Sequence, residues 1–326
     1  MDAKQRHLGY DNIRGILIIL VVFGHFLELC PGAVAGSPVY LLIYCFHMPA
    51  FIFLSGRFSK YDRQNIWKLF FLYQFFQFLY RLFAHIILGV CGAMSPDALV
   101  TTPYWLLWYL PVLLYCQSLL PLWSKLKLRG KLFLLFLSVI AALACGYCPR
   151  IGYSFSLSRF LVFLPFFLAG KLAGDFGLKV TKHHFLPILC AAAVLSLYLC
   201  CSGKFNAYML YGSYSYSIGY NAGIRLQSMI IAAVWIFLLL SFAQTALNRP
   251  MPVLSYLGAH TLPVYLLHGF AVKYISHISP SIPIITAAIC TAVVIALTGN
   301  PVTVSIFNRC LRIKKNERMK SSSHFL

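Results

Sequence analysis

Long hydrophobic runs, separated by short polar or basic stretches, recur along the whole chain. Each contains about 17 to 25 residues, the length at which an apolar α-helix crosses a bilayer, and none alternates strictly between polar and apolar positions. Backbone groups in lipid must hydrogen-bond within their own segment, which favours helices. The predicted membrane-spanning helices lie at about residues 13–29, 39–56, 66–91, 104–123, 131–148, 159–175, 185–202, 225–245, 261–278 and 282–299.

Composition agrees with a polytopic membrane protein. Hydrophobic residues make up 60% of the chain, charged residues only 10%, and the mean hydropathy is +0.78. We therefore predict an all-α fold with about ten transmembrane helices in a single transmembrane domain, residues 1–326, with no appended soluble domain. The first run lacks a small-residue cleavage site, so we expect it to remain as the first helix.

The basic residues predict the orientation of these helices. The formal net charge is +20, but Lys and Arg lie in short loops and tails between apolar runs, which indicates membrane topology rather than nucleic-acid binding. With the N-terminus inside, 21 of the 27 basic residues face the cytoplasm. We predict a multi-pass protein of the cytoplasmic membrane with both termini in the cytoplasm.

The first run, DNIRGILIILVVFGHFLEL, carries three ionisable residues. His25 lies eleven positions after Arg14, about three helical turns, and Glu28 follows one turn later. All three are therefore expected on one helix face, with Arg14 at the inner boundary and His25 roughly 16 Å deeper. Charged groups within a membrane are costly and usually mark a pathway or a site.

Three further segments carry candidate residues. His47, in the second run, lies at a depth similar to that of His25, ten residues from Arg57 at the inner end. In the third run Arg81 and His85 share a face, and the ninth run places His268 at intermediate depth. A single histidine is more often a packing residue, but the acidic and basic neighbours of His25 favour a functional site around it.

Other site chemistries lack their residues. The chain shows no H-E-x-x-H, no paired Cys/His zinc spacing, no Walker loop and no G-x-S-x-G elbow, so no metal site is predicted. Cys145 and Cys148 form a C-x-x-C pair at the end of an apolar run. Buried small residues or an incidental disulfide are favoured there over redox catalysis.

Three segments resemble the integral-membrane acyltransferase 3 family, which includes bacterial glycan O-acetyltransferases. Arg14 and His25 fit the family's pattern of Arg or Lys, ten residues, and His in the first helix. The segment FHMPAFIFLSGRF is similar to the family's second helix, and HTLPVYLLHGF is similar to a late helix. The chain departs from the family at Arg81, where no R-x-x-R or R-x-R pair is present.

The resemblance implies transfer of an acyl group, commonly acetyl, from cytoplasmic acyl-CoA to a hydroxyl of a glycan or lipid-linked sugar, with no bound cofactor. It makes His25 the essential histidine and Arg14 its partner. We expect His25 to act as general base, Glu28 to orient it, and His47 and His268 to position the thioester or donate to its oxyanion.

The other candidate residues are expected to bind the donor or the substrate. Arg14, with Arg57 nearby, is expected to bind the phosphates of CoA. Arg81, His85 and His268 are candidates for substrate binding or support.

Two other classes of protein are compatible with the same sequence. A transporter or flippase of a polysaccharide precursor also places His, Arg and Glu in the membrane, although no inverted repeat is evident. A polysaccharide polymerase usually has a larger outer loop than this chain. The acceptor stays open among peptidoglycan, O-antigen, exopolysaccharide and a small molecule.

Overall fold

The structure is a computed structural model that describes residues 8–32, 37–178, 185–205, 215–216 and 220–311. Every regular element in these ranges is a helix, which confirms the all-α prediction for this part of the chain. The α-helices are α1 Leu8–Leu27, α2 Pro38–Phe58, α3 Arg63–Ile86, α4 Pro96–Val100, α5 Tyr109–Ser118, α6 Leu120–Lys125, α7 Leu128–Ala144, α8 Leu157–Asp175, α9 Phe185–Cys201, α11 Ala222–Gln244, α12 Pro252–Ala259, α13 Thr261–Ile278, α14 Ile284–Gly299 and α15 Pro301–Cys310. The 3₁₀ helices are η1 Trp105–Trp108, η2 Cys145–Tyr147 and η3 Ser154–Ser156.

Each of the ten predicted segments contains a helix, but fewer meet the criteria for a membrane span. Six helical segments in the described ranges are long and apolar enough to cross a membrane, or seven if the bent pair α14 and α15 is one span. The count of about ten spans and the cytoplasmic location of both termini therefore stay predictions. The basic residues predicted at the two ends of the chain, at 4, 6 and 312–320, lie outside the described residues.

Several element boundaries differ from the predicted ones. The third helix ends at Ile86 rather than near residue 91, because the chain turns at Gly89, whose φ of +65° favours glycine. Three short helices, α4, α12 and α15, were not predicted. Each begins with a proline at its first position, a good helix start, but none is long enough to register as an apolar span.

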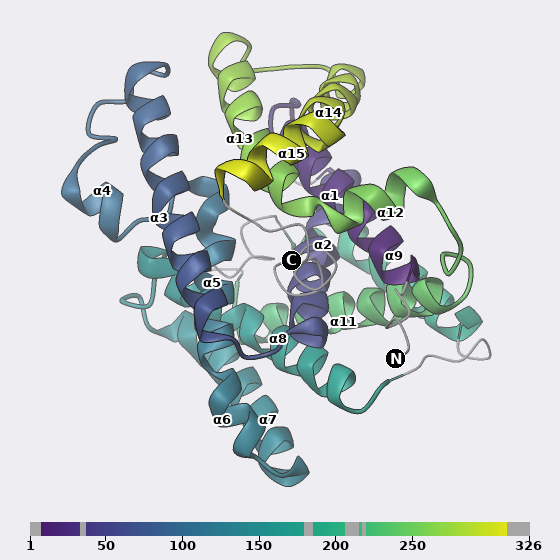
Figure 1. Cartoon of the computed structure of the whole chain (residues 1–326). Helices are drawn as coiled ribbons and strands as arrows, with labels where there is room; N and C mark the ends of the chain where they lie inside the picture. The colour runs from purple at the N-terminus through teal and green to yellow at the C-terminus, as the bar shows by residue number, and fades with distance from the viewer. Residues whose placement is uncertain (1–7, 33–36, 179–184, 206–214, 217–219, 312–326) are drawn as a thin grey trace.

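Helix α1 is central to the bundle and packs against α2, α11, α12, α13 and α14 (Figure 1). Its apolar stripe, with Leu17, Ile18 and Val22, is almost fully buried in this packing. Helices on the outside, such as α9 and α14, instead expose apolar side chains. The exposed large residues of α14 are Ile284, Ile285, Ile289, Val293 and Leu297. These faces fit contact with lipid acyl chains rather than with water.

Helices α2 and α8 approach each other at small residues. A Cβ atom built on Gly170 would lie 1.9 Å from the backbone oxygen of Phe53, and one on Gly56 would lie 2.0 Å from that of Phe167. Neighbouring Ser55 donates to the backbone oxygen of Phe51 and lies 3.0 Å from the hydroxyl of Tyr109. The small residues at the inner end of α2 therefore serve close helix packing.

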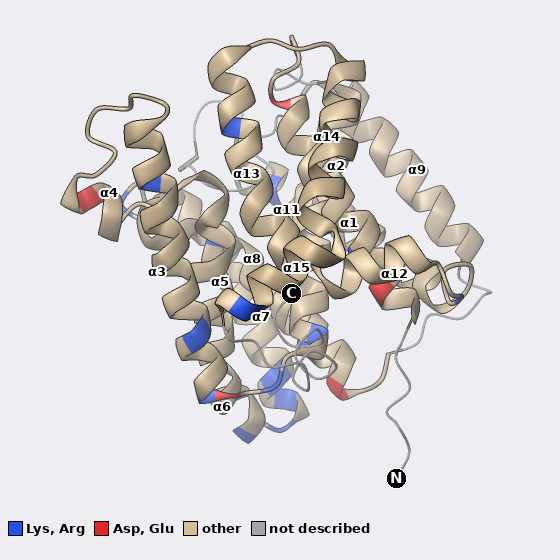
Figure 2. Ribbon diagram, turned by 45° about the horizontal axis from the view of Figure 1, so that its top comes forward, with Lys and Arg blue, Asp and Glu red and all other residues tan. Residues whose placement is uncertain are grey.

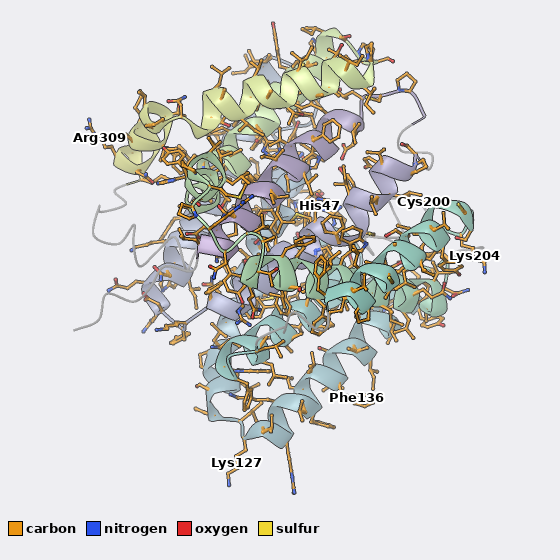
Figure 3. The ribbon with its side chains drawn as sticks, turned by 90° about the vertical axis from the view of Figure 1, so that its right-hand side faces the viewer. His47, Lys127, Phe136, Cys200, Lys204 and Arg309 are labelled. Carbon is orange, nitrogen blue, oxygen red and sulfur yellow. The ribbon has the colours of Figure 1, made fainter. Side chains whose placement is uncertain are left out.

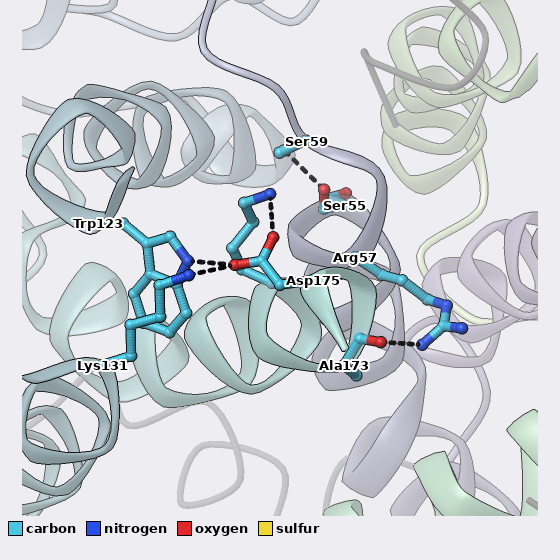
Figure 4. A network of polar contacts seen from close by, with 8 residues as sticks. Ser55, Arg57, Ser59, Trp123, Lys131, Ala173 and Asp175 are labelled. Atoms are coloured by element: carbon cyan, nitrogen blue, oxygen red, sulfur yellow. Dashed lines mark hydrogen bonds and ion pairs between the residues drawn. The ribbon is translucent and has the colours of Figure 1, made fainter. Parts of the chain in front are cut away.

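Lys and Arg gather at the end of the bundle that holds α6 and the start of α7 (Figure 2). Asp175, at the end of α8, organises part of this end, because its carboxylate accepts from Trp123 Nε1 at 2.8 Å, Lys131 Nζ at 2.7 Å and Lys171 Nζ at 2.8 Å (Figure 4). The three donors come from α6, α7 and α8 itself. The carboxylate thus links three helices at one end of the bundle.

Replacement of Gly170 by Ala tests the α2–α8 contact. The added methyl group requires a backbone shift, and we expect a loss of about 1–3 kcal/mol in unfolding free energy, measured as a lower melting temperature in detergent. Gly152→Ala is the matched control, because the nearest atom to its added Cβ is 4.0 Å away. Equal melting temperatures for the two variants would contradict the packing described.

Candidate active site

His25 and Glu28 form a hydrogen-bonded pair where α1 ends. His25 Nδ1 lies 2.9 Å from Glu28 Oε1, and the two side chains are 14% and 25% exposed. An ionised carboxylate only accepts hydrogen bonds, so Nδ1 carries the proton and Nε2 carries the lone pair. The pair therefore leaves an oriented imidazole with its basic nitrogen directed away from Glu28.

Tyr44, from α2, completes this pair. Its hydroxyl donates to Glu28 Oε1 and lies 3.4 Å from His25 Nδ1. Glu28 thus receives hydrogen bonds from two side chains on two helices. This contact fixes the carboxylate, and through it the ring of His25.

Two buried histidines flank the pair. The His268 ring stacks on His25 with centroids 5.4 Å apart, and the His47 ring lies 4.9 Å from that of Tyr44. The structure therefore brings together His25, Glu28, His47 and His268 from three helices. Figure 3 shows His47 inside the bundle, whereas Lys127, Phe136, Lys204 and Arg309 lie on its outside.

The hydrogen bonds of the flanking histidines define what they can do. His47 Nδ1 lies 2.7 Å from the carbonyl oxygen of Ile43, and His268 Nδ1 lies 2.9 Å from that of Val264. A carbonyl oxygen only accepts, so each Nδ1 is the protonated nitrogen and each Nε2 is an acceptor when the ring is neutral. His268 Nε2 is buried and has no hydrogen-bond partner within the described ranges.

Two residues beside His25 were not predicted from the sequence. The Trp105 ring, at the start of η1, lies 4.4 Å from the His25 ring, and Lys273 Nζ lies 4.1 Å from the centroid of Trp105. Lys273 belongs to α13 and also interacts electrostatically with Glu28. Tyr44 was likewise missed, because one of 20 tyrosines in a hydrophobic chain carries no distinctive spacing.

Arg14 lies in the other half of α1 and is more enclosed than the sequence predicted. Its side chain is 3% exposed, its guanidinium lies 4.8 Å from the centroid of the Phe58 ring, and Nη1 is 3.9 Å from Asp11 Oδ1. Within a continuous helix the rise from Arg14 to His25 is roughly 16 Å. Arg14 is thus a buried cation rather than one at an open boundary.

Aromatic contacts connect the two halves of this region. The charge of Arg14 acts on the Tyr109 hydroxyl, and the Tyr109 ring lies 5.5 Å from that of Tyr265. Tyr265 in turn lies 6.3 Å from His268. Neighbouring rings of Tyr109, Tyr265 and His268 therefore connect Arg14 with His25 through the core.

The other predicted arginines hold backbone segments. Arg57 donates to the carbonyl oxygens of Ala173 at 3.0 Å and Leu178 at 3.1 Å, at the end of α8 (Figure 4 shows the first of these bonds). Arg81 donates to the carbonyl oxygen of Thr102 at 2.6 Å, just before η1. Arg81 therefore supports the segment that presents Trp105, one contact away from His25.

The remaining candidates lie apart from this cluster. His85 is exposed on α3 and has no contact with the cluster among the described residues. Cys145 and Cys148 are free thiols, so the incidental disulfide is not formed. Cys145 is buried beside Arg225, whose Nη1 lies 3.1 Å from its sulfur, while Cys148 is half-buried. No group of three potential metal ligands lies together within the described part.

Comparison with known proteins gives two kinds of match. The first is to curated relatives over short segments. The chain is 45% identical over 58 residues to "Nodulation protein NolL" of Sinorhizobium fredii, which covers 17% of this chain and 16% of that protein. It is 45% identical over 62 residues to the protein of the same name from Mesorhizobium japonicum, covering 18% of this chain and 17% of that protein. Each match thus spans about a sixth of the relative's length, and no solved structure matches the chain significantly.

The second match covers nearly the whole chain. Residues 7–299 match the acyltransferase domain of the acyltransferase 3 family, and this range includes α1, α2, α13 and every residue of the cluster around His25. This match confirms the resemblance to the family that Arg14, His25 and the two later segments indicated. The chain belongs to the acyltransferase 3 family of membrane acyltransferases.

Proposed function

We propose that this protein transfers an acyl group, acetyl in the first instance, from cytoplasmic acyl-CoA to a hydroxyl of a cell-surface or lipid-linked glycan. The observation that carries the proposal is the pair of His25 and Glu28, 2.9 Å apart, in a chain of the acyltransferase 3 family. A hydroxyl is a poor nucleophile at neutral pH until a base removes its proton. Because Nδ1 of His25 is hydrogen-bonded to Glu28, Nε2 is the nitrogen that can accept this proton.

The proposed reaction uses the pair as a unit. His25 Nε2 takes the proton of the acceptor hydroxyl as the oxygen attacks the thioester carbon. Glu28, held by Tyr44, keeps Nδ1 protonated and stabilises the imidazolium that forms. The proton then passes from Nε2 to the sulfur of CoA as the carbon–sulfur bond breaks.

The donor is proposed to enter from the basic end of the bundle. This assignment makes that end cytoplasmic, as the positive-inside rule favours, and places His25 toward the opposite end of α1. Arg14, in the inner half of the same helix, is the proposed partner of CoA phosphate, and the pantetheine arm then covers the roughly 16 Å between Arg14 and His25. The host membrane in this proposal is the cytoplasmic membrane.

A transporter of a polysaccharide precursor is the competing function, and the family match does not favour it. The same ionisable residues serve acyl transfer in the proposal without an alternating-access pathway. The names of the curated relatives specify no acceptor, so the glycan class rests on the family resemblance. Mass spectrometry of surface glycans, with and without the gene, identifies the acceptor by its acetyl esters.

Replacement of His25 by Ala tests the base. We expect kcat to fall by about 10³-fold or more, because a positioned general base contributes about 10²–10⁴-fold. The measurement is CoA release from acetyl-CoA by purified protein in lipid nanodiscs, with methyl glycosides as acceptor probes. His277→Ala is the matched control, since His277 is an exposed histidine in the last turn of α13 and is not among the candidate site residues, and it should retain full activity. A fully active His25→Ala variant would exclude His25 as the base.

Replacement of Arg14 by Lys tests donor binding. Lysine keeps the positive charge but loses the bidentate fork, so the KM for acetyl-CoA should rise about tenfold or more while kcat changes less. Arg129→Gln, at an exposed basic position, serves as the control for a general loss of charge. Because Arg14 is buried, melting temperatures are measured in parallel. An unchanged KM in a folded Arg14→Lys variant would remove Arg14 from the donor site.

A further inference from the structure

We propose that Lys273, held on the indole ring of Trp105, is the oxyanion-binding residue of this active site. The inference rests on the proposed acyl transfer and assigns a catalytic residue that neither the sequence patterns nor the family resemblance supplied. Among the side chains near His25, Lys273 is the one with hydrogen-bond donors that no described residue uses, so it can bind the thioester oxygen.

Attack on a thioester places negative charge on the carbonyl oxygen, and a donor must lie where that charge develops. His47 and His268 were the expected donors. Each uses its Nδ1 proton on a backbone carbonyl, so its Nε2 accepts rather than donates in the neutral ring. The Tyr44 hydroxyl proton is directed to Glu28. Before binding the oxyanion, either histidine would have to gain a second proton, and Tyr44 would have to break its hydrogen bond to Glu28.

Lys273 has the donors that these residues lack. Its ammonium group carries three N–H bonds, and it makes no hydrogen bond to any residue in the described ranges. Its described interactions are the face of Trp105, at 4.1 Å, and the charge of Glu28. An aromatic face attracts an ammonium group without using its N–H donors in conventional hydrogen bonds.

Trp105 connects this ammonium group to the base. Its ring lies 4.4 Å from that of His25 and 4.1 Å from Lys273 Nζ, so one side chain contacts both groups. Trp105 has a φ of +33°, a left-handed conformation that a bulky residue rarely adopts. Tyr153 secures its backbone by donating to its carbonyl oxygen, and Arg81 holds the carbonyl oxygen of Thr102, three residues earlier in the chain. Such a strained and well-braced residue is typical of functional sites.

The charges of the site balance through the reaction. At rest Glu28 and Lys273 carry opposite charges and His25 is neutral. As the acceptor oxygen bonds to the thioester carbon, its proton moves to His25 Nε2 and the carbonyl π electrons move to oxygen, which Lys273 then binds. When the carbonyl re-forms, the carbon–sulfur bond breaks, and the sulfur takes the proton from Nε2. The products are the acyl ester and CoA thiol.

Replacement of Lys273 by Met tests the inference, since methionine keeps most of the side-chain volume without the charge or the donors. With acetyl-CoA as donor and methyl glycosides as probes, we expect kcat to fall about 10²–10³-fold, while the KM for acetyl-CoA changes less than about threefold. Lys273→Arg keeps a charged donor and should retain at least a tenth of the activity. Lys204→Met is the matched control, because Lys204 also lies over an aromatic ring, that of Tyr198, and should be neutral.

The pH profile separates an oxyanion contact from a simple counter-charge to Glu28. If Lys273 only balances that charge, its removal makes His25 easier to protonate, and activity returns fully at high pH. An oxyanion contact leaves the high-pH plateau low. A plateau restored to the wild-type rate would overturn the inference, as would a Lys273→Met variant within threefold of wild type.

Different results would contradict the proposed acyl transfer and the proposed role of Lys273. A wild-type protein that releases no CoA, or an active His25→Ala variant, overturns the acyl-transfer proposal and the inference with it. An inactive His25→Ala variant beside an unimpaired Lys273→Met variant overturns only the role of Lys273. Melting temperatures identify folding defects, and if Lys273→Met does not fold, the same comparison is made with Lys273→Gln.

Discussion

A carboxylate that is three-quarters enclosed by the protein needs hydrogen bonds or a counter-charge, because burying an unpartnered charge is costly. Glu28, just after the end of α1, meets this requirement with His25 from α1, Tyr44 from α2 and the charge of Lys273 from α13. The interactions of this one carboxylate thus connect α1, α2 and α13. The same contacts fix the ring orientation and the tautomer of His25, so the structural requirement and the proposed chemistry share their residues.

The position of α1 in the bundle makes this arrangement rigid. The helix is surrounded by five others and its apolar stripe is buried, so His25 and Arg14 are held at a fixed separation on one element. Close backbone contacts such as that between α2 and α8 limit how far the surrounding helices can shift. Residues on rigid helices are positioned more accurately than residues on loops, which suits the proposed acyl transfer.

Part of the site could be predicted from the sequence because it lies on one helix. The i to i+3 spacing predicts the contact between His25 and Glu28, and the resemblance to the family makes Arg14 a candidate on the same helix. Tyr44, Trp105 and Lys273 come from three other segments, and periodicity within a segment carries no information on such long-range contacts. The tautomers of His47 and His268 also depend on local backbone carbonyls, so their inability to donate when neutral appears only in the structure. For the fold, the hydropathy pattern predicted the long helices. The short helices that begin with proline were missed because they are shorter than a membrane-spanning run.

The most direct test of the account uses oriented proteoliposomes with labelled acetyl-CoA on one side of the membrane and acceptor glycan on the other. Acyl transfer along α1 predicts labelled acetyl esters on the glycan when acetyl-CoA is supplied at the basic end, and none when it is supplied at the opposite end. Passage of unmodified glycan across the membrane without any labelled ester would contradict the account and indicate a transporter.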